Sequence, residues 1–158
     1  MHPETPSEGA PKPFPPERWQ EVRARLERLA AAVGLPIDPP ARNVNSRFAL
    51  ETAELVRDLG GDGASGAFHH EVSRAYFAER ADISKPEIIV PLAERYGVAA
   101  AEVEAAWDER RYLRTVDGFI EDALRAGVTG VPAMAWPNHR AAVGMRQPSD
   151  LVALLQDR

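Results

Sequence analysis

Apolar residues recur at three- and four-residue steps through most of this chain, with charged residues between them. This is the period of an amphipathic helix. Some runs are bounded by residues that favour helix ends: Asn45 or Ser46 can cap the start of one run, and Gly34 and Gly127 follow the last apolar positions of two others. The pattern predicts helices over about residues 17–33, 46–60, 64–81, 85–97, 98–107 and 108–127.

The two ends of the chain lack this period. Residues 1–16 are rich in proline and poor in apolar side chains, so this segment is predicted to be an extended, mobile arm. Near the other end, residues 133–136 and 140–143 are short strand candidates around Pro137-Asn138-His139, and Pro148 begins a closing helix. The expected fold class is therefore mostly α, of the α+β type, with one β-hairpin.

The composition adds limits on location and partners. The 158 residues are 44% hydrophobic and 27% charged, with a formal net charge of −5. No apolar run is long enough to span a bilayer, and basic residues alternate with acidic ones instead of forming a stripe suited to phosphate groups. The opening residues lack the apolar region of a secretory signal. We therefore expect a cytoplasmic protein that binds neither membrane nor nucleic acid.

Candidate side-chain chemistry is sparse. The sequence contains no cysteine, which excludes disulfides, thiolate nucleophiles and zinc–thiolate sites among these residues. His69 and His70 are a poor metal pair, because adjacent helical side chains point about 100° apart. Arginines such as Arg111 and Arg125 lie within helical reach of acidic residues and are better explained as surface ion pairs. We predict no catalytic residue, no metal site and no cofactor.

One segment carries a recognisable motif. Residues 127–134, Gly-Val-Thr-Gly-Val-Pro-Ala-Met, resemble the cis-proline motif that ends the long helical insertion and opens the third core strand of DsbA-like thioredoxin-fold proteins. Residues 2–9, 45–50 and 143–151 are similar, in the same order, to segments of the FrnE-like branch. The resemblance implies a helical insertion domain over 17–127 and a partial thioredoxin-fold segment over 128–158.

The resemblance also implies what precedes this part in the family: a first strand, a Cys-x-x-Cys motif with its helix, and a second strand. We therefore expect an incomplete thioredoxin fold without the catalytic thiols. If an upstream reading frame supplied the Cys-x-x-Cys, ordinary thiol–disulfide oxidoreductase activity would be expected instead. In the family, the backbone before the cis-proline pairs with bound peptide or thiol, which implies a binding face formed by Thr129, Gly130, Val131 and Pro132.

The same comparison predicts an open strand edge. In a thioredoxin fold the third strand is central, so the strand formed by Ala133, Met134, Ala135 and Trp136 would lack a neighbour on one side. Exposed edges tend to pair with another chain. The expected partner is a second copy, which would give a homodimer by antiparallel pairing of two such strands. The alternative partner is a separate chain that carries the missing strands.

Three functions remain open, and the sequence leaves it undecided whether the chain is an enzyme. The first is a redox-inactive relative of thiol–disulfide oxidoreductases that keeps the binding face for a peptide or small thiol. The second is a protein like the glutathione-using branch of the superfamily, which includes 2-hydroxychromene-2-carboxylate isomerases and kappa-class glutathione transferases. The third is a helical interaction or assembly protein.

Overall fold

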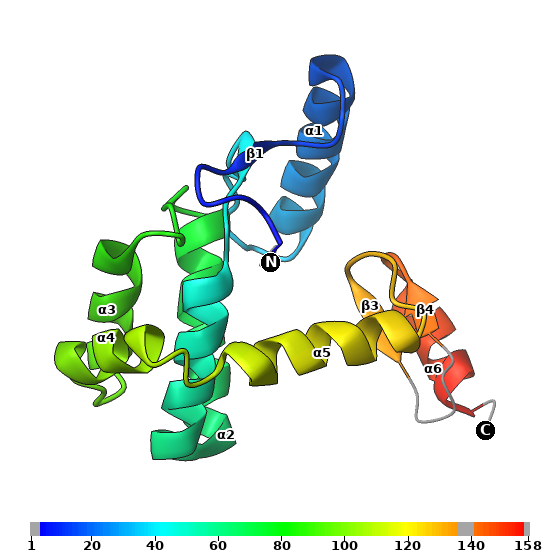
Figure 1. The fold of residues 1–158 in the computed structure, drawn as a ribbon. Helices are drawn as coiled ribbons and strands as arrows, with labels where there is room; N and C mark the ends of the chain where they lie inside the picture. Colours follow the sequence, from blue (N-terminus) through cyan, green and yellow to red (C-terminus); the bar gives the residue numbers. More distant parts are fainter. Residues whose placement is uncertain (1–3, 136–140, 157–158) are drawn as a thin grey trace. The chain divides into compact units, whose positions relative to one another are not determined.

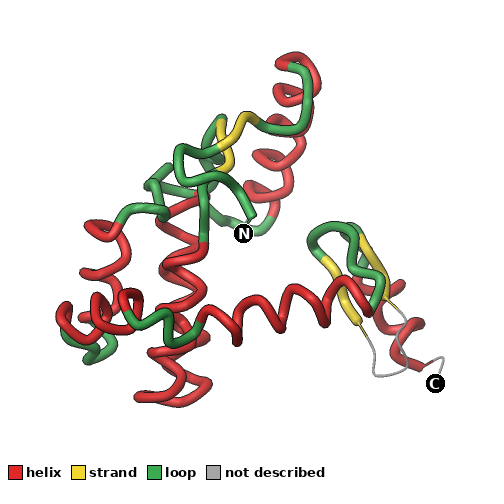
Figure 2. The backbone as a smooth tube through the Cα atoms, in the orientation of Figure 1, coloured by secondary structure: helices red, strands yellow, loops and turns green. Residues whose placement is uncertain are grey.

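The structure is a computed structural model that describes residues 4–135 and 141–156. It divides into two compact units, Met1–Leu113 and Arg114–Arg158. Figures 1 and 2 show a largely helical chain with two small antiparallel sheets. The helices are α1 (Pro16–Ala32), α2 (Arg47–Phe77), α3 (Pro86–Glu94), α4 (Ala100–Asp108), α5 (Leu113–Arg125) and α6 (Pro148–Gln156).

These elements confirm the predicted mostly α, α+β fold class. The unit boundary differs from the predicted domain boundaries, because the first 16 residues belong to the first unit and the helical region is divided after Leu113. None of the helices in the described ranges has the length and apolar character needed to cross a membrane.

The long helix α2 is interrupted at Gly61, where the sequence predicts a turn between two helices. Gly61 has φ 79° and ψ −179°, a backbone conformation that essentially only glycine adopts. The chain then doubles back, so that the Ser65 hydroxyl donates to the Ala53 carbonyl at 3.0 Å. The two halves of α2 therefore form a helical hairpin (Figure 1).

The core of the first unit lies between this hairpin, α3 and α4, which pack against one another. The apolar period that predicts the helices explains this arrangement, because each helix turns one apolar face inward. Side chains of residues far apart in sequence share the core: the largest fully buried ones include Phe68, Leu55, Ile83, Ile89, Val56, Val72, Val98 and Val103.

The opening segment is not a free arm where it is described, which corrects the prediction for residues 1–16. Strand β1 (Ala10–Pro11) pairs antiparallel with β2 (Arg42–Asn43). Thr5 is buried, and its carbonyl accepts a hydrogen bond from the Asn45 side chain. Proline content alone suggested an unattached segment, whereas the pairing with β2 supplies the missing hydrogen-bond partners.

Lys12 explains further how this segment is held. Its Nζ donates to Asn43 Oδ1 at 2.7 Å and lies 5.0 Å from the centre of the Trp19 ring and 5.8 Å from that of Tyr76. Cations over aromatic rings are attracted by the ring quadrupole. Partial burial lowers the pKa of Lys12 below its ordinary value. The lysine thus connects the opening segment to both α1 and α2.

The second unit contains most of α5, a β-hairpin and α6. Strands β3 (Ala133–Ala135) and β4 (Ala141–Val143) pair antiparallel, with Ala133 opposite Val143, Met134 opposite Ala142 and Ala135 opposite Ala141. The predicted hairpin is therefore present. Its described part contains no third strand.

Candidate functional site

The connection from α5 to β3 is fixed by its hydrogen bonds. The N–H groups of Gly127 and Val128 donate to the carbonyls of Leu124 and Ala123, at 3.0 and 2.9 Å. Gly127 has φ +78°, the left-handed conformation in which glycine commonly ends a helix. This cap stops α5 and releases the chain into the Thr129–Pro132 segment.

Pro132 joins this segment to the hairpin. The Val131–Pro132 peptide bond is cis, and the Pro132 carbonyl accepts a hydrogen bond from the Gly144 N–H at 2.8 Å. Gly144 has φ +90° and turns the chain after β4. Val131 is 72% exposed. Pro132 is thus hydrogen-bonded to the residue that follows β4, while Val131 is exposed to solvent.

The register decides which backbone groups of β3 are available. In an antiparallel pair, residues that exchange hydrogen bonds alternate with residues that do not. Since Pro132 is bonded opposite Gly144, the next bonded pair is Met134 with Ala142. The N–H and C=O groups of Ala133 and Ala135 therefore face the other side of β3, and no strand covers them in the described part of the sheet.

The predicted binding residues Thr129, Gly130, Val131 and Pro132 lead directly into this uncovered side of β3, which we call the outer edge. Ala133 and Ala135 are exposed and Met134 is half-buried. Trp136, the last residue of the predicted edge strand, lies outside the described residues. The outer edge can pair with the backbone of an extended chain, because every polar group it offers is an N–H or a carbonyl.

This edge has little catalytic chemistry of its own. Thr129 contributes the one side-chain hydroxyl among residues 129–135, and that range has no titratable side chain. A general acid, a base or an activated nucleophile needs such a side chain, or a partner that shifts its pKa. Residues 129–135 therefore offer backbone hydrogen-bonding groups and no acid–base side chain.

The histidine pair His69-His70 was considered as a metal site, and the structure describes the surroundings of His69. Partial burial lowers the pKa of His69, and the positive charge of Arg57 lowers it further. Within the described ranges, no cluster of three or more His, Cys, Asp or Glu side chains could hold a metal ion.

The arginines discussed from the sequence form ion pairs. Arg111 pairs with Glu102 at 2.6 Å and Glu109 at 2.8 Å, and Arg125 pairs with Asp122 at 2.6 Å. The surface ion-pair interpretation is confirmed for both arginines.

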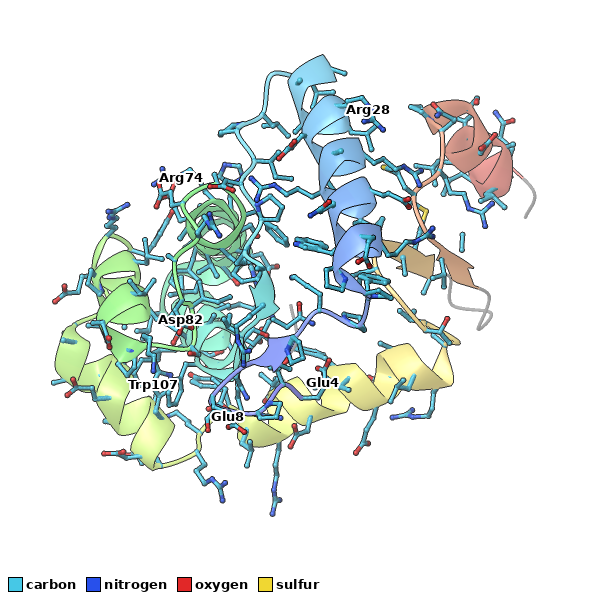
Figure 3. The ribbon with its side chains drawn as sticks, turned by 90° about the horizontal axis from the view of Figure 1, so that it is seen from above. Glu4, Glu8, Arg28, Arg74, Asp82 and Trp107 are labelled. Atoms are coloured by element: carbon cyan, nitrogen blue, oxygen red, sulfur yellow. The ribbon has the colours of Figure 1, made fainter. Side chains whose placement is uncertain are left out.

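A set of polar contacts around α2 was not predictable from any sequence pattern. The Tyr112 hydroxyl donates to Asp58 Oδ2 at 2.6 Å, and Trp107 Nε1 donates to Thr52 Oγ1 at 3.2 Å. Figure 3 shows Trp107 on α4, next to α2. Burial and the hydrogen bond to Asp58 raise the pKa of Tyr112 to about 12. The partners are 54 and 55 residues apart, so no local spacing could have revealed them.

Comparison with known proteins shows which family this chain matches. A search of curated proteins found no match. Among solved structures, the fold is similar to that of a candidate protein disulfide isomerase from Nitrosomonas europaea, with a TM-score of 0.65 and 18% sequence identity over 94% of this chain and 76% of that one. The family model described as DSBA-like thioredoxin domain matches residues 1–156. The chain therefore belongs to the DSBA-like thioredoxin domain family.

Proposed function

We propose that this chain is a DsbA-like domain that binds an extended peptide along the outer edge of β3 and performs no thiol–disulfide exchange of its own. The observation that carries the proposal is the run of uncovered backbone groups at Ala133 and Ala135, continuous with the exposed Val131 beside Pro132. The resemblance of residues 127–134 to the family's cis-proline motif supports the same assignment.

Strand addition is the binding mode that fits these residues. An extended peptide that joins a sheet edge gains main-chain hydrogen bonds, while pockets for alternate side chains give specificity. Ala133 and Ala135 present small, uncharged side chains. The edge should therefore accept many peptide sequences, since it has neither bulk nor charge with which to select one.

The absence of cysteine predicts the redox behaviour. Disulfide exchange requires attack by a thiolate on a disulfide sulfur, and these 158 residues contain no cysteine. In the insulin-reduction assay, the 158-residue chain should leave the rate given by dithiothreitol unchanged. Catalysed precipitation of the insulin B chain by this protein would contradict the proposal.

Binding is tested with fluorescein-labelled, S-carboxymethylated insulin B chain, followed by fluorescence anisotropy. Ala135→Pro removes an N–H from the outer edge of β3, and we expect it to weaken binding at least ~10-fold, the loss of about one charge-free hydrogen bond together with a misfit at the edge. The matched control is Val143→Pro, which removes an N–H from the opposite side of the same hairpin.

Circular dichroism should show both variants folded, and the control should bind as the unchanged chain does. Equal weakening by the two substitutions, or no binding of the labelled chain at all, would contradict the assignment of the outer edge of β3. Reduced glutathione is the second probe: displacement of the labelled chain by glutathione would favour the glutathione-using alternative.

A further inference from the structure

The second unit exposes several large apolar side chains in its described part. Within its described part, the buried hydrophobic residues are Val116 and Ala142. By contrast, large apolar side chains on α5, on α6 and in the segments flanking the hairpin are exposed: Phe119, Leu124, Val131, Met145, Val152 and Leu155. These exposed apolar side chains are available for contact with a second chain.

The charge of the second unit fits a partner identical to itself. Residues 114–158 contain five arginines and five acidic residues, so their formal charges cancel, whereas residues 1–113 carry the whole net charge of −5. Two copies that met through their first units would repel each other, while two second units can approach without net repulsion. The β3 residues that would meet have no charged side chain.

We propose that two copies of this chain pair antiparallel along the outer edges of their β3 strands, about a two-fold axis at Met134. The outward backbone groups of Ala133 then bond to those of Ala135 of the second copy, and the reverse. Met134 lies opposite its own equivalent. A two-fold contact needs only one surface that complements itself, and the two hairpins become one four-stranded sheet.

β4 is the less suitable strand for this contact. Arg140 immediately precedes it in the sequence, and charged residues beside an edge strand disfavour pairing with another chain. The exposed apolar Val131 precedes β3 instead. The dimer proposal does not depend on peptide binding, although both would occupy the outer edge of β3 and would therefore compete.

The absence of cysteine allows a clean cross-linking test. Opposite residues of a non-hydrogen-bonded antiparallel pair have Cα atoms about 4.5 Å apart, within the range that a disulfide spans. Met134→Cys should therefore give a disulfide-linked dimer on mild oxidation. The matched control is Ala142→Cys, which lies opposite Met134 on β4 and should remain monomeric on a non-reducing gel.

Sedimentation without any peptide supplies the second measurement. The unchanged chain should shift from monomer to dimer with rising concentration, and Ala135→Lys should raise the dimer dissociation constant at least ~10-fold by adding like charges to both strands. Monomer at every concentration, or equal cross-linking by the two cysteine variants, would overturn the proposal. Peptide binding is measured at concentrations where the chain is monomeric, so its result does not depend on the dimer proposal.

Discussion

Tyr112 and Asp58 form a contact between two elements that no sequence pattern relates. The 2.6 Å hydrogen bond joins the residue before α5 to the first half of α2. Tyr112 is buried, and its raised pKa of about 12 reflects burial first and the hydrogen bond second. The neutral phenol is therefore the form that the folded state favours.

This contact predicts a pH dependence. An unfolded tyrosine has a pKa of about 10. The contribution of Tyr112 to the free energy of unfolding is therefore fully present below pH ~10, and it is lost as the pH rises toward about 12. Tyr112→Phe should cost about 1 kcal/mol at neutral pH. The measurement is urea unfolding of both proteins from neutral to alkaline pH, and the stability difference should narrow within that window. A constant difference would contradict this role of Tyr112.

Residue roles were predictable from sequence where the partner lies nearby in the chain. Arg125 pairs with Asp122 three positions away, and helical spacing alone predicts this contact. The cation–π contacts of Lys12 with Trp19 and Tyr76 depend on how the chain folds back, so no spacing rule reaches both. The same limit applies to the Trp107–Thr52 hydrogen bond.

At the scale of elements, the apolar period predicted the helices well, because it repeats within a few residues. The hairpin followed from two short strand candidates around a turn. It missed the pairing of β1 with β2, since each strand is two residues long. Strands of that length contain no full alternation of side chains. The prediction of a mobile arm over residues 1–16 was therefore wrong where residues 10–11 pair with β2.

The break in α2 gives a prediction at this scale. Gly61→Ala places a side chain where φ is 79° and ψ is −179°, and should lower the free energy of unfolding by about 1–3 kcal/mol. The matched control is Gly66→Ala, in the second half of α2 with open space around the position, which should raise it by up to ~1 kcal/mol. Urea unfolding followed by circular dichroism measures both. Equal effects of the two substitutions would show that Gly61 does not set the turn.

At the scale of the whole molecule, the ordered resemblance of four segments identified the family, and the family match over residues 1–156 confirms it. Composition could not have done so, because its proportions are those of many helical proteins. The boundary between the two units lies after Leu113, whereas the resemblance implied one after residue 127. It depends on which helices share a core, and the apolar period is the same in both units.

The outer edge of β3 is the proposed binding surface. Hydrogen–deuterium exchange by mass spectrometry, at protein concentrations below self-association, tests it most directly with S-carboxymethylated insulin B chain as ligand. Addition of the ligand should slow exchange in fragments that cover Ala133–Ala135 and leave fragments that cover β4 unchanged, because the Ala142 N–H is already bonded to β3. Saturated binding of the ligand without slower amide exchange in the β3 fragments would contradict binding at the outer edge.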